Sequence, residues 1–198
     1  MNAAFKKLVF GTKNKNKLLE VRSLLKGSDI EVVEIEGDFD PEETGATFEE
    51  NSYIKAFEAA KMMEVPALAD DSGLVVDALD GRPGVYSSRY EKTDEGRINK
   101  LLEEMENVVQ KDRTARFICS MALVAPNGEK LFSTTQTCEG EIVFSPSGQD
   151  GFGYDPVFYL PQKNVTMAEL PIEEKNKISH RGKAFVKIVE WLISQATG

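Results

Sequence analysis

The chain has 198 residues, of which 41% are hydrophobic and 29% are charged. This length suits one substantial core, and the composition is that of a folded globular protein rather than a disordered one. The formal net charge is −9, from 24 Lys and Arg against 33 Asp and Glu, so the surface repels nucleic acid in general. A small polyanionic substrate would therefore need a local group of Lys and Arg, a metal ion, or both.

The apolar segments and the cysteines limit the class of protein further. No apolar run approaches the roughly 20 residues that a membrane-spanning helix needs, and residues 8–10 are too short for a signal-peptide core. We therefore expect a cytoplasmic protein with no membrane partner. Cys119 and Cys138 fall in strand-like segments, where we expect buried, reduced thiols. With one histidine beside two cysteines, a hard cation held by carboxylates, Mg²⁺ or Mn²⁺, is favoured over zinc.

Hydrophobic periodicity predicts the elements of the N-terminal half. They are a strand over 6–11, a helix over 16–26 that stops at Gly27, a strand over 30–35, an acidic loop over 38–45, a helix from Thr47 to about Met63, and a strand that begins at 67–69. Leu18, Val21 and Leu25 share one face of the first helix. Thr47 and Glu50 have the spacing of a capping box, which opens the second helix.

The C-terminal half continues the alternation of helices and strands. We predict a helix marked by Ile98, Leu101, Leu102 and Met105, a strand over 113–124, a turn at 126–128, a returning strand over 131–139 and a helix over 179–193 with Phe185, Ile188, Val189 and Leu192 on its buried side. In the first of these strands, Ala115, Phe117, Cys119, Met121 and Leu123 face one way. The order favours an α/β fold with a mixed sheet flanked by helices, and no linker interrupts residues 1–198.

The lysine-rich segment over residues 11–17 follows the first strand and opens the first helix. A helix start offers backbone N–H groups and a positive dipole end, to which anions bind readily. The segment lacks the second glycine and the Gly-Lys-Ser/Thr ending of a P-loop. It is a candidate phosphate site, and a solvated basic helix start is the alternative.

The pair Asp70 and Asp71 lies in an apolar strand context and is followed by what we read as a small turn, Ser72-Gly73. Adjacent like charges are unfavourable unless a cation or hydrogen-bond donors compensate them. A divalent ion is a common compensation near phosphates. An ordinary turn begun by an aspartate is the alternative.

Three further segments carry polar or aromatic side chains of interest. Residues 82–90 form a stiff loop with two arginines. Glycines flank Phe152 and Tyr154, which lets the backbone approach a planar ligand that one of these rings could stack on. Lys175, Ser179, His180 and Arg181 gather before the last helix. Taken alone, each segment is also compatible with an unremarkable turn or surface.

Together these segments resemble the inosine/xanthosine triphosphate pyrophosphatase family. The resemblance is carried by six stretches in the family's order: Thr12-Lys13-Asn14-Lys15-Asn16-Lys17; Glu42-Glu43-Thr44-Gly45 with Phe48 to Ala56; Ala69 to Leu74; Gly84 to Tyr90; Gly151 to Pro156; and Lys175 with Ile178 to Gly182. It implies an ITPase-like α/β fold, an elongated mixed β-sheet flanked by helices, with two lobes around a central nucleotide-binding cleft. It also implies a homodimer and a Mg²⁺-dependent hydrolase.

The implied reaction cleaves ITP, dITP or XTP between the α and β phosphates, giving a nucleoside monophosphate and pyrophosphate. The resemblance assigns Asp71 as proton acceptor for the attacking water, and Glu42 with Asp71 as ligands of the metal. Asp70 is left as a second ligand or a structural partner. The substrate-binding residues that it implies are Thr12, Lys13, Asn14, Lys15, Asn16, Lys17, Lys55, Ser72, Phe152, Gly153, Tyr154, Asp155, Lys175, His180 and Arg181.

Selection of the base would follow from hydrogen-bond donors aimed at a purine 6-oxo group. Lys175 and Arg181 supply donors and no acceptors, whereas adenine presents an amino group at that position. Such a mismatch can discriminate by about 10⁴-fold. Guanine also carries a 6-oxo group, and the sequence does not locate what would reject GTP. Phe152 is the candidate stacking surface.

Three alternatives remain beside this interpretation. A phosphorylatable signalling receiver also uses paired acids, Mg²⁺ and a lysine, but its acidic pair follows the first strand, where this chain has the lysine-rich segment. A nucleotide-binding module without catalysis is a second alternative, against which the retained Asp71 argues. A related pyrophosphatase with another base preference is the third.

Overall fold

A computed structural model describes residues 7–26, 30–35 and 37–195. The predicted strand start at Lys6 and helix stop at Gly27 lie outside these residues. The helices are α1 (Lys15–Leu24), α2 (Phe48–Met63), α3 (Asp94–Glu104), α4 (Ile172–Ile178) and α5 (His180–Ser194). The strands are β1 (Lys7–Phe10), β2 (Glu31–Glu34), β3 (Ala67–Val76), β4 (Thr114–Val124), β5 (Lys130–Ile142), β6 (Phe158–Leu160) and β7 (Val165–Thr166).

The strands form one open mixed sheet in the order β2-β1-β3-β4-β5-β6-β7. Strand β1 pairs in parallel with β2 and β3, whereas β6 is antiparallel to β5 and β7. A tight turn in which Ala125 N–H donates to Glu129 C=O joins the neighbours β4 and β5, as the predicted hairpin requires. The predicted α/β class and mixed sheet are confirmed.

Contacts along the chain group it into two compact units. Unit 1 contains Met1–Asp71, Cys119–Gln136 and Arg181–Gly198, and unit 2 contains Ser72–Ile118 and Thr137–His180. Three boundaries fall inside β3, β4 and β5, so each of these strands contributes residues to both units, and the fourth follows His180, the first residue of α5. The first residue of unit 2 directly follows Asp71, the candidate proton acceptor.

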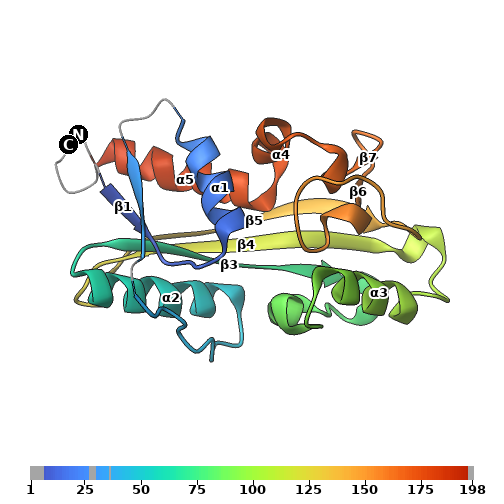
Figure 1. The fold of residues 1–198 in the computed structure, drawn as a ribbon, viewed down its shortest axis with the longest axis horizontal. Helices are drawn as coiled ribbons and strands as arrows, with labels where there is room; N and C mark the ends of the chain where they lie inside the picture. The colour runs from blue at the N-terminus through green and yellow to red at the C-terminus, as the bar shows by residue number, and fades with distance from the viewer. Residues whose placement is uncertain (1–6, 27–29, 36, 196–198) are drawn as a thin grey trace. The chain divides into compact units, whose positions relative to one another are not determined.

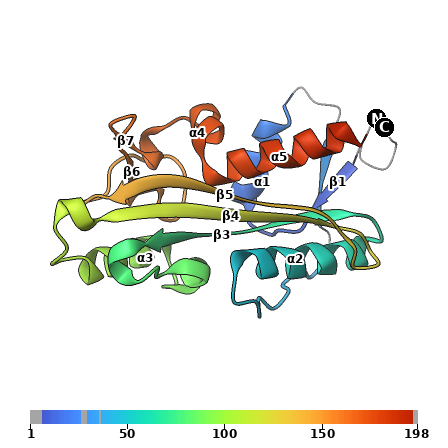
Figure 2. The same ribbon diagram turned by 180° about the vertical axis from the view of Figure 1, so that it is seen from behind.

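In unit 1, helices cover both faces of the strands. Helices α1 and α5 lie on one face and α2 lies on the other (Figures 1 and 2). The first face is filled by a cluster that includes Leu18 and Val21 of α1 and Phe185 of α5. On the other face, Ala56 of α2 packs with Ala69 and other small side chains. Small residues on this side let α2 approach β3 closely, which brings its polar side chains to the strand.

Unit 2 has its own apolar core, built from β3 to β6 with α3 and the segment around Tyr154. Arg113, which is 1% exposed, lies at its edge. The guanidinium donates to the backbone carbonyls of Met105, Val108, Ile142 and Val143. Four carbonyl acceptors satisfy a buried cation that has no carboxylate among these partners, so Arg113 is explained as a structural residue.

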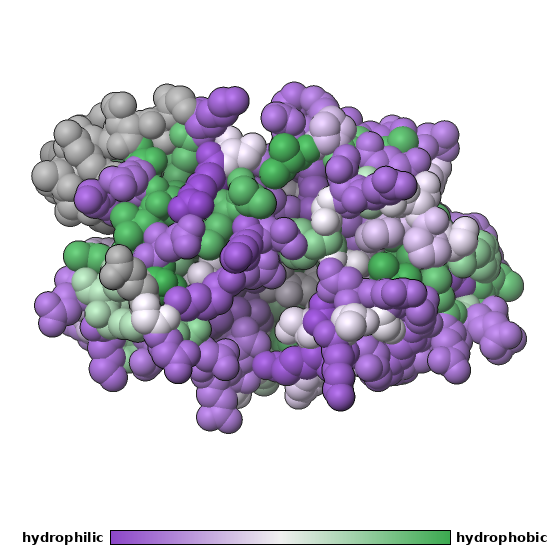
Figure 3. All heavy atoms as spheres, viewed as in Figure 1, coloured by the Kyte–Doolittle hydropathy of each residue, from purple (hydrophilic) through white to green (hydrophobic). Residues whose placement is uncertain are grey.

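The surface agrees with the composition. Hydrophilic side chains dominate the face drawn in Figure 3, with separate hydrophobic patches among them. Among the described residues, no helix combines the length and apolar character needed to cross a membrane. Cys119 and Cys138 are buried thiols, as predicted.

Most predicted helices and strands are present within a few residues of their expected ends, but one predicted turn was wrong. The small turn expected after Asp71 does not form, because β3 continues through Ser72 and Gly73 to Val76. The strand is buried along nearly its whole length, and short apolar runs buried on both faces lack the alternation that identifies a strand. Both aspartates therefore lie within a strand, which fixes their directions.

Candidate functional site

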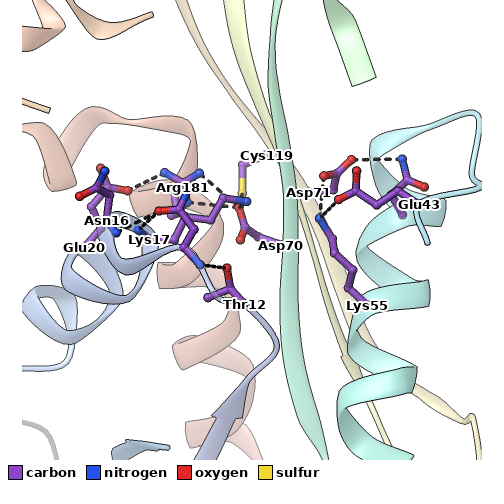
Figure 4. A network of polar contacts seen from close by, with 12 residues as sticks. Thr12, Asn16, Lys17, Glu20, Glu43, Lys55, Asp70, Asp71, Cys119 and Arg181 are labelled. Carbon is purple, nitrogen blue, oxygen red and sulfur yellow. Dashed lines mark hydrogen bonds and ion pairs between the residues drawn. The ribbon is translucent and has the colours of Figure 1, made fainter. Parts of the chain in front are cut away.

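Asp70 and Asp71 point to opposite sides of β3 (Figure 4). Successive side chains of a strand alternate between its two faces, so neighbours in sequence meet different surroundings. Asp70 meets Lys17 and Arg181, whereas Asp71 meets Lys55. The expected repulsion between adjacent carboxylates is therefore relieved by separate cations, one set on each face.

The side of Asp71 joins the acidic loop, α2 and β3. Lys55 Nζ donates to Asp71 Oδ1 and to Glu43 Oε1, both at 2.7 Å. Asn51, one turn earlier on α2, donates through Nδ2 to Asp71 Oδ2 at 3.3 Å and accepts from the Gly45 N–H at 2.8 Å. One asparagine thus connects the acidic loop to the candidate proton acceptor.

Gly45 is required at this connection by close approach. A Cβ added to it would lie 2.6 Å from Glu50 Cβ and 2.7 Å from Asn51 Oδ1. The capping box of α2 is formed as predicted, with Thr47 accepting from Glu50 N–H and the Glu50 carboxylate accepting from Thr47 N–H. The cap fixes where α2 begins, and so where Asn51 and Lys55 point.

Burial governs the protonation of this cluster. Burial raises the pKa of Asp71 above its ordinary value, and the attraction of Lys55 only partly offsets this effect. Burial opposes the charge of Lys55, but the carboxylates of Asp71, Asp70 and Glu43 together raise its pKa. The result is a charged lysine beside an aspartate whose proton affinity is increased.

The side of Asp70 is a buried ion network. Arg181 Nε and Nη2 donate to Asp70 Oδ2 at 3.2 and 3.3 Å, and Arg181 Nη1 donates to Glu20 Oε2 at 2.5 Å. Lys17 Nζ lies 3.0 Å from Asp70 Oδ2. Burial lowers the pKa of Lys17 although Asp70 opposes this, and for Arg181 the carboxylates of Glu20 and Asp70 outweigh burial and raise the pKa.

The lysine-rich segment opens α1 as predicted, but its cap is already made. Asn14 Oδ1 accepts from the N–H groups of Asn16 and Lys17 at 2.9 and 3.3 Å, and Thr12 Oγ1 accepts from Asn14 N–H at 3.1 Å. Two of the N–H groups that we expected to be available to phosphate are thus taken by the Asn14 side chain. The exposed side chains of Asn16 and Lys15 remain at the helix start.

Lys13 has a different position from its neighbours. Its Nζ donates to the carbonyls of Ile35 and Gly37 at 2.9 and 2.7 Å. These carbonyls lie at the start of the stretch that leads into the acidic loop. Lys13 therefore links the lysine-rich segment to the segment that carries Glu42 and Glu43.

The carboxylates of unit 1 can hold a hard cation only if water molecules and substrate phosphates supply its other ligands. Glu42 is exposed, whereas the adjacent Glu43 pairs with Lys55. In the part of the chain that the structure describes, no group of three or more His, Cys, Asp or Glu side chains is arranged to hold a metal ion. Magnesium commonly takes one or two protein carboxylates, with water and substrate phosphates as its other ligands. Lys55 joins Asp71 to Glu43, which brings the acidic loop and its glutamates to this carboxylate.

The predicted base-contacting residues of unit 2 do lie together. Lys175 Nζ donates to Asp155 Oδ2 at 2.6 Å and lies 4.8 Å from the centroid of the Phe152 ring. Asp155 also accepts from Phe152 N–H at 2.9 Å. Tyr154 is buried, and its hydroxyl donates to Ser87 C=O at 2.9 Å. Of the two rings that we considered for stacking, only Phe152 is partly exposed.

The remaining predicted residues are placed as follows. Ser72 is half-buried within β3. His180, the first residue of α5, is buried and stacks on Phe117 with ring centroids 4.8 Å apart. Arg181 belongs to unit 1, whereas Lys175 belongs to unit 2. The two residues proposed as 6-oxo donors therefore have different partners and different surroundings.

Sequence reasoning missed two residues of the Asp71 cluster and one of the base segment. Glu43 and Asn51 both lie within the family-like stretches, and their four-residue spacing places Asn51 and Lys55 on one helix face. Asp94, which accepts from Gly153 N–H at 2.9 Å, is 59 residues away from its partner. No local signal could have found that contact.

Comparison with known proteins identifies the family of this chain. The model of the Ham1 family matches residues 8–191. A "dITP/XTP pyrophosphatase" of Synechocystis sp. is 48% identical over 185 residues, 93% of this chain and 94% of its own. One from Geobacter sulfurreducens is 49% identical over 192 residues, 94% of this chain and 96% of its own. The solved structure of a HAM1 protein from Coxiella burnetii has a TM-score of 0.84 at 43% identity, covering 95% of this chain and 98% of the other. The chain belongs to the Ham1 family.

Proposed function

We propose that this protein hydrolyses non-standard purine nucleoside triphosphates, ITP, dITP and XTP, to the nucleoside monophosphate and pyrophosphate. The observation that carries the proposal is the Asp71 cluster, in which a buried carboxylate of raised pKa is held by Lys55 and Asn51. The similarity to curated dITP/XTP pyrophosphatases supports the substrate class. Removal of such nucleotides from the pool is the corresponding role in the cell.

Asp71 would accept the proton of the attacking water. As water attacks the α phosphorus, the bond from that phosphorus to the oxygen bridging to the β phosphorus breaks, and pyrophosphate leaves. A cation on Asp71 would make this carboxylate a weaker base, so acidification of the water by the bound metal would supply most of the driving force for proton transfer. Lys55 stays charged beside it and stabilises the negative charge of the phosphates.

Magnesium is the proposed metal, with Glu42 and Asp71 as its protein ligands. When bound, it neutralises phosphate charge and acidifies a water molecule. Glu42 is exposed, so its carboxylate is accessible to an ion, whereas Glu43 holds Lys55 in place. Thr12, Asn16, Lys15 and Lys17 of the lysine-rich segment are proposed to contact the phosphates.

In unit 2 we propose that the purine stacks on Phe152 and that Lys175 donates to its 6-oxo group. Lys175 is a donor that never accepts, and its ammonium group lies over the Phe152 ring, 4.8 Å from the centroid. Arg181 directs all three of its guanidinium nitrogens at Asp70 and Glu20, so we favour Lys175 for this contact. A homodimer in the cytoplasm and one domain with two lobes are also proposed.

The nucleotide test is a panel of ITP, dITP, XTP, GTP and ATP with Mg²⁺, in which pyrophosphate and orthophosphate are measured separately. We expect pyrophosphate from the first three, at kcat/KM values about 10⁴-fold above that for ATP. Release of orthophosphate would contradict the assigned cleavage point. Equal rates for ITP and ATP would favour a pyrophosphatase with another base preference.

The two glutamates give a second prediction. Glu42→Gln is expected to raise the Mg²⁺ concentration for half-maximal activity at least about tenfold, which corresponds to roughly 1.4 kcal/mol of lost ion binding. Glu43→Gln, the matched control, removes an equal charge from the adjacent residue and is expected to change that concentration less. Binding of Mn²⁺ to each variant is measured alongside activity. A larger effect of Glu43→Gln on metal binding would reverse the assignment.

A further inference from the structure

Three hydrogen bonds hold the segment that carries the proposed purine contacts. Each joins one residue of the segment to an acceptor at 2.9 Å: Phe152 N–H to Asp155 Oδ2, Gly153 N–H to Asp94 Oδ2, and Tyr154 O–H to Ser87 C=O. All of these residues belong to unit 2. The position of the Phe152 ring therefore depends on anchors outside the ring itself.

Two of the residues that form these hydrogen bonds, Tyr154 and Asp155, are buried and also pack inside unit 2. Tyr154 is 4% exposed and Asp155 is 3% exposed. Burial raises the pKa of Tyr154 well above its ordinary value, so the phenol keeps its proton and remains a donor to Ser87. Removal of either anchor would disturb the core of unit 2, and its effect on the ligand could not be separated from an effect on folding.

The third anchor is different because Asp94 lies at the surface. Its side chain is 50% exposed, and it is the first residue of α3. Its Oδ1 accepts from Arg97 Nη1 at 2.5 Å, while Arg97 Nε donates to Glu91 C=O at 2.9 Å. Arg97 thereby holds the carboxylate in place, with Oδ2 directed at Gly153 N–H. Because Asp94 is exposed, its side chain does not fill the core, and its two hydrogen bonds need another explanation.

The bond from Asp94 acts at the peptide that follows Phe152. Gly153 has a φ of +63°, which favours glycine, and a Cβ there would meet nothing within 4 Å. Glycine is thus explained by the backbone conformation rather than by lack of space. The flexibility of glycine means that the direction of its N–H must be fixed by a partner. That partner is Asp94. The neighbouring Phe152 ring lies under the ammonium group of Lys175, whose Nζ is 4.8 Å from the ring centroid.

We propose that Asp94 is a positioning residue for purine selection: its hydrogen bond to Gly153 holds the Phe152 ring and the Lys175 ammonium group in the arrangement that receives a 6-oxo purine. This inference rests on the proposed function and deepens it. Asp94 does not touch the reacting phosphates. It acts on the affinity for the base, through the segment it anchors.

The test compares Asp94→Ala, Asp94→Asn and Glu95→Ala. Asp94→Ala removes the acceptor, and we expect KM for ITP to rise about tenfold, the size of one hydrogen bond to a charged acceptor, with kcat little changed. The ratio of kcat/KM values for ITP and ATP should fall with it. Asp94→Asn keeps a carbonyl oxygen facing Gly153 and is expected to recover most of the loss.

Glu95→Ala is the matched control. Glu95 is the other acidic residue in the first turn of α3 and is exposed, so its loss has the same effect on the helix dipole. It should leave KM and the ITP/ATP ratio unchanged. Equal effects of Asp94→Ala and Glu95→Ala, or an unchanged KM in Asp94→Ala, would overturn the proposal. So would a loss that Asp94→Asn fails to recover.

The same measurements separate this inference from the proposed function. If the wild-type protein prefers ITP to ATP and Asp94→Ala keeps that preference, only the role of Asp94 is wrong. If the wild-type protein has no preference for 6-oxo purines, both proposals are wrong. Thermal unfolding of each variant is measured in parallel, and an equal fall of activity on ITP and ATP together with a lowered unfolding temperature would assign Asp94 to stability instead.

Discussion

Asp71→Asn is expected to lower kcat for ITP by about 10³-fold or more, because the amide can neither accept the proton of water nor bind a hard cation as a carboxylate does. Pyrophosphate release under saturating ITP and Mg²⁺ measures this. A variant that retains more than about a tenth of the wild-type kcat would contradict the catalytic assignment, since a positioned general base alone commonly contributes about 10²-fold or more.

The same substitution is expected to leave the protein folded. Burial raises the pKa of Asp71, so the ionised form is less favourable in the folded chain than in the unfolded chain. Such a carboxylate reduces stability as pH rises above its unfolded pKa, and the neutral asparagine removes this penalty. Lys55 keeps its partner Glu43 at 2.7 Å. The control is Asp70→Asn, which should lower the free energy of unfolding more than Asp71→Asn does, although the two residues are adjacent.

Arg181→Met is expected to lower the free energy of unfolding by about 3–5 kcal/mol, a large share of the 5–15 kcal/mol that typically stabilises a domain. The side chains of Arg181, Glu20 and Asp70 are 3%, 4% and 0% exposed. Loss of the guanidinium removes the cation that the buried carboxylates of Glu20 and Asp70 share, while Lys17 Nζ still lies 3.0 Å from Asp70 Oδ2. Unfolding in urea, followed by circular dichroism, measures the change.

Two comparisons separate this effect from a general loss of charge. Arg22→Met breaks an exposed pair with Glu34, whose side chains are 48% and 54% exposed, and should change stability by less than about 1 kcal/mol. Adding Glu20→Gln to Arg181→Met removes the charge of one of the two buried carboxylates that paired with Arg181 and should recover part of the loss. An Arg181→Met variant of unchanged stability but raised KM would instead support a direct contact between Arg181 and the base.

Several elements could be predicted because their signals are local. The capping box at Thr47 and Glu50, the apolar face of α3 and the alternation along β4 each depend on residues within a few positions of one another. Helix α4 and strands β6 and β7 were missed. They are seven, three and two residues long, too short for a periodic pattern to develop, and they depend on the rest of unit 2 for their stability.

By itself, the sequence determined the family to which this chain belongs and the residues that are proposed to carry the chemistry. Six short stretches in a fixed order are a property of the chain, and they need no three-dimensional information. Only the tertiary structure decided which of these residues lie together and which lie on opposite faces of the sheet. Because β3 continues through Asp70 and Asp71, its alternation sends them to opposite faces. Asp70 meets Arg181, 111 residues later, in a buried ion network, while Asp71 meets Lys55 and Asn51 of α2. Contacts over such distances arise from packing, which no local pattern encodes.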